Sequence, residues 1–265
     1  MYAFEYHRPT SVADAVSLLK RAGDGVLMAG GMTLIPTLKQ RLASPSDVID
    51  LGGVKELSRI FVDRGSDLVI GALTPHAEVA GSSEVKGWIP ALAKLADSIG
   101  DPQVRNRGTI GGSIANNDPA ADYPAAVLAL KAKVHTDRRV IDADGFFTGM
   151  FETALAEDEV VTEVRFPKPK AAAYSKFPNP ASRYAIVGVV VARLDDGVRV
   201  AVTGAGPCVF RASDMERALA GNFAASALDG IKIKRDGLNS DIHASAEYRA
   251  HLVKVMAQRA VAAAS

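Results

Sequence analysis

The sequence predicts an α+β protein built in two parts, with a boundary near residue 170. Three features support this prediction. Strand and helix patterns alternate through the first part, and a segment rich in proline and lysine, residues 167–173, then interrupts them. Beyond that segment, two β-branched runs are joined by a hairpin signal, and helices follow to the end of the chain.

The first part opens with a predicted helix over residues 10–21, where apolar positions recur at helical spacing after Thr10 or Ser11 as the N-cap. Strands are expected at 26–29, 48–51, 68–70 and 160–166, the last of which ends at Pro167. Further helices are expected at 90–96 and 124–131. The pair Thr74-Pro75 is typical of an N-cap followed by a proline in the first helical turn.

In the second part, residues 167–173 form the predicted linker, and strands are expected at 184–194 and 198–203. Asp195-Asp196-Gly197 between them indicates a hairpin turn. The last helix is predicted over about 244–263. One face of this helix is expected to carry Tyr248, Leu252, Val255, Met256 and Arg259. We expect its apolar face, together with the loops beside the binding site, to contribute to an interface with another chain.

The composition is that of a globular protein without a strong charge preference. The chain has 265 residues, of which 48% are hydrophobic and 23% charged, and its formal net charge is +1. This balance gives no overall attraction to nucleic acid or anionic membranes. No apolar run reaches the roughly 20 residues of a membrane span, and the start of the sequence lacks the pattern of a signal peptide. We therefore expect a cytoplasmic protein.

The metal-binding residue types are sparse. A single cysteine, Cys208, excludes an internal disulfide and an iron–sulfur cluster held by this chain, and it is interpreted as a small buried residue. The five histidines are scattered, and none forms a pair at metal-binding spacing. If the chain handles electrons, it does so on an organic cofactor, and any metal centre must lie on another chain.

Two Gly-Gly segments stand out chemically. Residues 28–34 read Met-Ala-Gly-Gly-Met-Thr-Leu, and residues 109–115 read Thr-Ile-Gly-Gly-Ser-Ile-Ala. Glycine lets backbone N–H groups approach a pyrophosphate closely, and the hydroxyls of Thr33, Thr109 and Ser113 can add donors. Asp122 could accept a hydrogen bond from a ribose or another cofactor hydroxyl. We expect the N–H groups of both segments to face the ligand.

These segments do not match the common nucleotide fingerprints. There is no Walker lysine and no G-x-G-x-x-G opening a helix, and a tight turn alone is the alternative interpretation. Gly204-Ala205-Gly206 is rejected as a Rossmann site because Pro207 follows and Val209 takes the place of the third glycine. The residues by themselves are compatible with dinucleotide binding and indicate nothing narrower.

The same segments resemble the medium, FAD-binding subunit of the xanthine dehydrogenase and carbon monoxide dehydrogenase family. Its motif Ala-Gly-Gly-x-Ser-Leu is similar to residues 29–34, with threonine in place of serine. Its Thr-Ile-Gly-Gly is matched at 109–112, and its Asp-Pro-Ala-x-Asp at 118–122. The resemblance runs from residues 4–9 to residues 241–249, and so covers nearly the whole chain.

This resemblance implies a vanillyl-alcohol-oxidase-like (PCMH-type) FAD-binding domain over 1–170, with lobes of about 1–56 and 57–170. A small α+β domain like that of the CO dehydrogenase flavoprotein would follow over 171–265. Non-covalent FAD would contact both motifs, that is Ala29, Gly30, Gly31, Met32, Thr33, Leu34, Thr109, Ile110, Gly111, Gly112 and Ser113. Further implied contacts are Ile99, Asp122, Thr162 through its backbone, and Lys176 near the flavin ring. Tyr184 would lie over the isoalloxazine or, alternatively, be a buried aromatic of its strand.

The function implied is that of an electron-transfer subunit in a molybdenum hydroxylase, with no acid–base or nucleophilic residue of its own. A small subunit would hold [2Fe-2S] clusters, a large subunit would hold molybdopterin, and two heterotrimers would pair. FAD accepts single electrons and releases them in pairs, which is chemistry of the cofactor. Two alternatives stay open: a self-sufficient flavin oxidase or dehydrogenase of the same fold, and a non-catalytic module that has lost its flavin.

Overall fold

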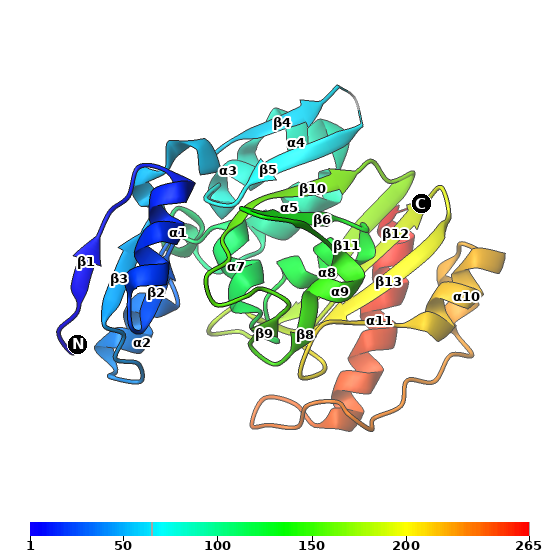
Figure 1. Ribbon diagram of the computed structural model, residues 1–265. Coiled ribbons are helices and arrows are strands. Elements are labelled where there is room, and N and C mark those ends of the chain that lie inside the picture. Colours follow the sequence, from blue (N-terminus) through cyan, green and yellow to red (C-terminus); the bar gives the residue numbers. More distant parts are fainter. Residues whose placement is uncertain (65, 265) are drawn as a thin grey trace.

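A computed structural model describes residues 1–64 and 66–264 (Figure 1). Its first lobe is a small parallel sheet in the order β1 (Glu5–His7), β3 (Asp47–Asp50), β2 (Gly25–Met28). Helix α1 (Val12–Arg21) begins where Ser11 Oγ accepts from the amide of Asp14 at 3.1 Å, and it buries Ala15 and Leu19. Helix α2 (Leu34–Lys39) follows β2, and 3₁₀ turns at Leu51–Gly53 and Lys55–Leu57 lead out of the lobe.

The second lobe contains an antiparallel five-stranded sheet in the order β4 (Ile60–Asp63), β5 (Asp67–Gly71), β10 (Val161–Pro167), β6 (Lys133–Thr136), β7 (Val140–Asp142). The helices of this lobe are α3 (His76–Gly81), α4 (Ser83–Trp88), α5 (Pro90–Asp97), α6 (Pro102–Arg105), α7 (Ile110–Asn116), α8 (Tyr123–Ala129) and α9 (Ala143–Phe146). A short hairpin, β8 (Phe147–Gly149) and β9 (Glu152–Thr153), follows α9. The core includes Leu68, Ile70, Ile110, Tyr123 and Phe166, all fully buried.

The C-terminal part is an antiparallel sheet in the order β11 (Ala171–Pro178), β12 (Ala185–Leu194), β13 (Gly197–Thr203), β14 (Phe210–Arg211). Helix α10 (Ser213–Gly221) and a 3₁₀ turn at Ala225–Leu228 precede the long helix α11 (Ala246–Ala264). In Figure 1, α11 runs along one face of this sheet, and the green helices of the second lobe lie toward the other face.

Both faces of strand β12 are buried, which explains its unbroken apolar sequence. Val190 and Ala192 point into the core of the second lobe, whereas Val189 and Val191 pack in the core beneath α11. An ion pair between Arg199 Nη2 and Asp144 Oδ2, at 2.8 Å, also joins the two parts. The α+β fold class predicted from the sequence is therefore confirmed.

The structure corrects three local expectations. Pro75, not Thr74, is the N-cap of α3, because the Thr74 hydroxyl donates to the Arg59 carbonyl 3.3 Å away. Pro167 is the last residue of β10 and residue 171 already starts β11, so the irregular link is shorter than residues 167–173.

The third correction concerns α11. Its buried face consists of Arg249, Leu252, Val253, Met256, Ala257, Ala260 and Val261, whereas Tyr248 and Arg259 are exposed. Because this helix packs on β11 and β12, its apolar face is covered by the chain's own sheet. The expectation that this face contributes to a partner interface is therefore wrong.

Candidate functional site

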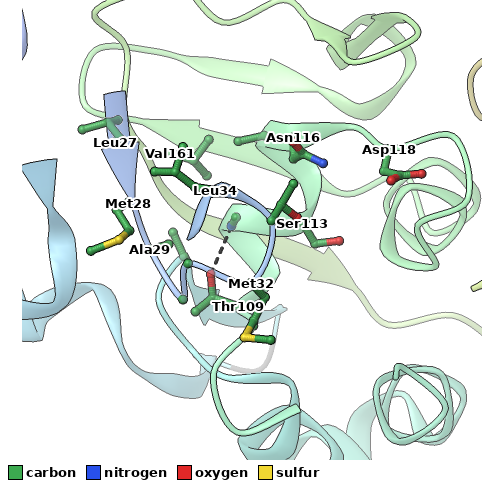
Figure 2. Close-up of a pocket in the computed structure, with 18 of the residues that line it drawn as sticks. Leu27, Met28, Ala29, Met32, Leu34, Thr109, Ser113, Asn116, Asp118 and Val161 are labelled. Atoms are coloured by element: carbon green, nitrogen blue, oxygen red, sulfur yellow. Dashed lines mark hydrogen bonds between the residues drawn. The ribbon is translucent and has the colours of Figure 1, made fainter. Parts of the chain in front are cut away.

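A cavity of about 720 Å³ lies between the first lobe, one side of α7 and the segment that precedes β12. The first lobe contributes residues 25–34, the second lobe contributes residues from α7 and its flanks, and residues 182–184 enter from the C-terminal part. This volume is within the range of about 300–1,000 Å³ that is usual for small-molecule and cofactor sites. Figure 2 shows the two Gly-Gly segments meeting here, with Thr109 beside the loop that carries Ala29 and Met32.

The first Gly-Gly segment forms the loop between β2 and α2, and this loop leaves its amides free. Within the described chain, the five successive backbone N–H groups of residues 30–34 have no hydrogen-bond acceptor. Gly31 has a φ of +72°, in the left-handed region that favours glycine. A Cβ on Gly30 would lie 1.9 Å from the Arg107 carbonyl oxygen, so only glycine fits against that backbone. The loop is therefore closely packed against neighbouring backbone, and its five successive N–H groups are available as hydrogen-bond donors.

The second Gly-Gly segment is built differently, because it is the first turn of α7. Thr109 is the N-cap, and its hydroxyl accepts from the amide of Gly112 at 3.1 Å. The amide of Gly111 donates to the Ala72 carbonyl at 2.9 Å, and those of Ile110 and Ser113 donate to the carbonyls of Thr74 and Thr109. All four amides thus have acceptors within the protein. The expectation that this segment directs free N–H groups at a ligand is wrong.

Gly111 is required by packing and not by ligand access. A Cβ on this residue would lie 2.5 Å from the Ala72 Cβ and 2.7 Å from the Ala72 carbonyl oxygen. The glycine therefore lets α7 approach the chain that leaves β5. Gly112 instead lies on the cavity side of α7, where a Cβ would be 3.5 Å from the Ala29 Cβ of the loop between β2 and α2.

The cavity side of α7 is polar. Gly112, Ser113 and Asn116 line the cavity, whereas Ile110 and Ile114 are fully buried in the core. The side chains of Ser113 and Asn116 make no hydrogen bond to other described residues, and Asp118 follows just beyond the helix (Figure 2). Burial raises the pKa of Asp118, while the amide of Ala120, 2.8 Å from Oδ1, lowers it. A hydroxyl, an amide and a carboxylate are thus presented in a row.

Asp122 lines the cavity, but its carboxylate is already engaged. Lys176 Nζ lies 2.9 Å from Oδ1 and also donates to the Ser98 carbonyl at 3.0 Å, and the Tyr174 hydroxyl donates to Oδ1. Only 4% of the Asp122 side chain and 7% of the Lys176 side chain are exposed. Burial raises the pKa of Asp122, and the adjacent Lys176 and Tyr174 counteract that effect. This buried cluster fastens β11 to the start of α8.

Residues 182–184 form one wall of the cavity from the C-terminal part. Arg183 has a φ of +63° and donates from Nη1 to the Gly100 carbonyl at 3.2 Å, so it bridges to the second lobe. Tyr184 lies just before β12 and is 46% exposed, and the interpretation of it as a buried strand aromatic is therefore wrong. Partial burial and the carboxylates of Asp118 and Asp122 raise its pKa.

The structure gathers most of the predicted site residues around this cavity. Those that line it are Ala29, Gly30, Gly31, Met32, Thr33, Leu34, Ile99, Thr109, Gly111, Gly112, Ser113, Asp122 and Tyr184. Ile110 is in the core, Lys176 lies behind Asp122, and Thr162 accepts through its carbonyl from the amide of Ala72 at 2.9 Å. These three do not line the cavity.

Several lining residues were not predicted from the sequence. Asn116 and Asp118 directly follow the second Gly-Gly segment, so their positions in the sequence could have indicated them. His76, Val161 and Arg183 carry no local signal, because each belongs to a different element that tertiary packing brings to the cavity. Among the described residues, no group of three or more His, Cys, Asp or Glu side chains is placed to hold a metal ion. In the same part of the chain, no helix is long and apolar enough to span a membrane.

Two family models together match almost the whole chain. Residues 2–169 match the FAD binding domain in molybdopterin dehydrogenase, and residues 172–264 match the CO dehydrogenase flavoprotein C-terminal domain. The chain is 38% identical to the nicotine 6-hydroxylase medium subunit of Paenarthrobacter nicotinovorans, over 98% of this chain and 96% of that protein. It is 36% identical to the carbon monoxide dehydrogenase medium chain of Hydrogenophaga pseudoflava, over the same shares of the two chains.

Solved structures give the same result. A chain of the carbon monoxide dehydrogenase from Hydrogenophaga pseudoflava aligns with a TM-score of 0.90 and 38% identity, covering 98% of this chain and 96% of that one. A chain of quinoline 2-oxidoreductase from Pseudomonas putida 86 aligns with a TM-score of 0.89 and 29% identity, covering 99% of this chain and 96% of that one.

Proposed function

The chain belongs to the family of FAD-binding domains found in molybdopterin dehydrogenases, and we propose that it is the FAD-carrying electron-transfer subunit of a molybdenum hydroxylase. In this proposal one FAD occupies the cavity between the two lobes and the segment 182–184. The homologues are subunits of oxidoreductases, and the chain spans 96% of the length of both medium subunits named above.

The observation that carries the proposal is the row of free amides at residues 30–34. A pyrophosphate needs several N–H donors that converge on its oxygens, and a loop after a β-strand supplies them without any charged side chain. The glycines at 30 and 31 cannot be replaced without collision or strain, so this path of the loop backbone depends on both of them. The donor set therefore fits the central part of FAD.

The remaining polar groups suit the sugar and ribityl hydroxyls of the cofactor. Ser113, Asn116 and Asp118 follow one side of α7 and offer both donors and acceptors to hydroxyl groups. The buried Lys176–Asp122–Tyr174 cluster holds β11 against α8, and so fixes the wall that carries Tyr184. FAD supplies the ability to accept electrons singly and release them in pairs. The protein would bind the FAD, orient it and provide the electrostatic environment around it.

We further propose that the electrons come from iron–sulfur clusters of a small subunit and originate at a molybdopterin centre in a large subunit. Relatives of this chain are named as medium subunits, which means that they work in assemblies of several chains. The single Cys208 and the lack of a metal-ligand group among the described residues support the placement of metal centres on other chains. The electrons would then leave the flavin for an external acceptor.

The first test is a flavin absorption spectrum of the purified chain or complex. We expect one FAD per chain, released into the supernatant on acid or heat denaturation, because neither Gly-Gly segment contains a histidine or cysteine for covalent attachment. Yellow colour that stays with the precipitated protein would refute non-covalent binding. A chain that neither contains flavin nor takes it up from added FAD would refute the proposal as a whole.

A further inference from the structure

The cavity contains one imidazole for which the proposed function has no role. His76 is the first residue of α3, lines the cavity, and is only 5% exposed. Its amide donates to the Gly108 carbonyl at 2.9 Å. A Cβ on Gly108 would lie 2.6 Å from His76 Nε2, so the Nε2 edge of the ring lies against the residue that precedes Thr109.

The two ring nitrogens of His76 have different surroundings. Nδ1 is fully enclosed and has no hydrogen-bond partner among the described residues. Nε2 also makes no hydrogen bond to any described residue, but unlike Nδ1 it is not fully enclosed by protein atoms. Nε2 is therefore the ring nitrogen of this cavity-lining residue that a bound molecule can reach.

The imidazole is neutral at ordinary pH. Burial and the positive charge of Arg105 lower the pKa of His76 to about 4. A neutral imidazole carries a single N–H, and a buried N–H with no acceptor is rarer in proteins than an unfilled acceptor. The proton is therefore placed on Nε2, and the enclosed Nδ1 carries the lone pair.

We propose that His76 is a further cofactor-binding residue, which donates a hydrogen bond from Nε2 to an uncharged acceptor atom of the FAD. The inference rests on the proposed function, since it needs FAD in this cavity. A neutral donor offers no charge to the pyrophosphate, for which residues 30–34 already provide amides. A ring nitrogen, a carbonyl or a hydroxyl of the cofactor is the matching partner.

The test is the affinity of the full chain for FAD, measured by fluorescence titration of flavin-free protein. The variant His76→Gln can place an amide N–H near the position of Nε2, and its dissociation constant should stay within about threefold of the wild-type value. His76→Leu removes the donor and should weaken binding by about tenfold, which corresponds to roughly 1.4 kcal/mol. His76→Asn keeps an amide but places it near Nδ1, and should resemble His76→Leu.

Tyr123→Phe is the matched control. The Tyr123 ring lies 5.3 Å from that of His76, and its hydroxyl is likewise buried without a partner, but Tyr123 does not line the cavity. Removing this hydroxyl should leave FAD affinity unchanged and should not lower the melting temperature. Circular dichroism of each variant shows whether it is folded before its affinity is compared.

The pH profile distinguishes a neutral donor from a charged one. The affinity of the wild-type chain for FAD should not change between about pH 5.5 and 8, because His76 stays neutral throughout this range. A tenfold loss of affinity from pH 6 to 8 that is absent in His76→Gln would overturn the neutral donor. Equal affinity in wild type, His76→Leu and His76→Asn would overturn the inference while leaving FAD binding intact. A wild-type chain that binds no FAD would instead refute the proposed function.

Discussion

At the scale of single residues, the cavity depends on side chains whose ionisation is fixed by the fold. Glu159, just before β10, is 4% exposed and lies at the edge of the cavity. Its carboxylate accepts three hydrogen bonds: from Arg139 Nε at 2.8 Å, from the Thr136 hydroxyl at 2.8 Å and from the amide of Ala156 at 2.9 Å. These contacts, that with Arg139 above all, lower the pKa of Glu159 to about 2.

The depressed pKa gives a prediction about stability. Because the folded state holds Glu159 ionised, its contribution is fully present above the unfolded pKa of about 4.5 and is lost as the pH falls toward 2. Glu159→Gln should lower the free energy of unfolding by about 2–3 kcal/mol at pH 7. The difference from wild type should shrink between pH 5 and pH 3, as measured by urea unfolding.

Glu157→Gln serves as the control for this measurement. Glu157 is exposed, lies in the same segment and makes no hydrogen bond or ion pair with other described residues. Its replacement should change stability by less than about 0.5 kcal/mol. If the two variants lost equal stability at pH 7, the role assigned to the Glu159 contacts would be wrong.

At the scale of elements, the two Gly-Gly segments look alike in sequence but serve different purposes. The loop between β2 and α2 presents free amides, whereas the first turn of α7 uses its amides internally and needs its glycine for close packing. Adding a side chain should therefore reduce ligand binding in the first segment and stability in the second.

Gly31→Ala should lower FAD affinity by about tenfold or more while the chain stays folded. The φ of +72° costs an alanine about 1–2 kcal/mol, and the new Cβ would press on Ile35 Cδ1, the flexible end of a side chain. Gly111→Ala should instead lower the melting temperature strongly, because its Cβ would collide with the backbone at Ala72. Differential scanning calorimetry and the flavin-to-protein ratio together distinguish the two outcomes.

Gly23→Ala is the matched control in the first lobe, because a Cβ there would meet nothing within 4 Å and the residue has no positive φ. It should leave both affinity and melting temperature at wild-type values. If Gly111→Ala kept the wild-type melting temperature and lost only FAD, the packing role of Gly111 would have to be abandoned.

At the scale of the whole molecule, we propose that the chain holds a cofactor whose electron donor and electron acceptor lie on other molecules. We expect a permanent complex with the iron–sulfur and molybdopterin subunits, since a net charge of +1 gives little long-range steering for transient encounters. Obligate interfaces commonly bury about 2,000 Å² or more. Exposed apolar side chains such as Met150, Phe151 and Ile242 remain available for that contact, unlike the covered face of α11.

Native mass spectrometry after co-expression with both partner genes tests this expectation. The flavin chain should emerge in a stoichiometric complex that survives gel filtration at 0.5 M salt, about the condition at which steering charges are screened. The chain expressed alone should contain or accept FAD but show no turnover with small substrates. Full oxidase activity of the isolated chain would establish a self-sufficient flavin enzyme instead.

The sequence alone determined the fold class, the principal strands and helices, and the two Gly-Gly segments. These follow from local properties, because periodicity, caps and the absence of a Cβ at residues such as Gly31 act over a few neighbouring positions. The single Cys208 likewise excluded a cluster held by this chain without any knowledge of the fold.

Tertiary structure decided which of these residues can reach a ligand. The amides of Ile110 and Gly111 are occupied because the carbonyls of Thr74 and Ala72, from a distant part of the chain, lie against α7. Lys176 reaches Asp122 and does not line the cavity because β11 packs on α5, where Lys176 also donates to the Ser98 carbonyl. His76 lines the cavity because its amide binds the Gly108 carbonyl at the start of α3. Whether a polar group is free or satisfied depends on partners far away in sequence, and no local pattern records them.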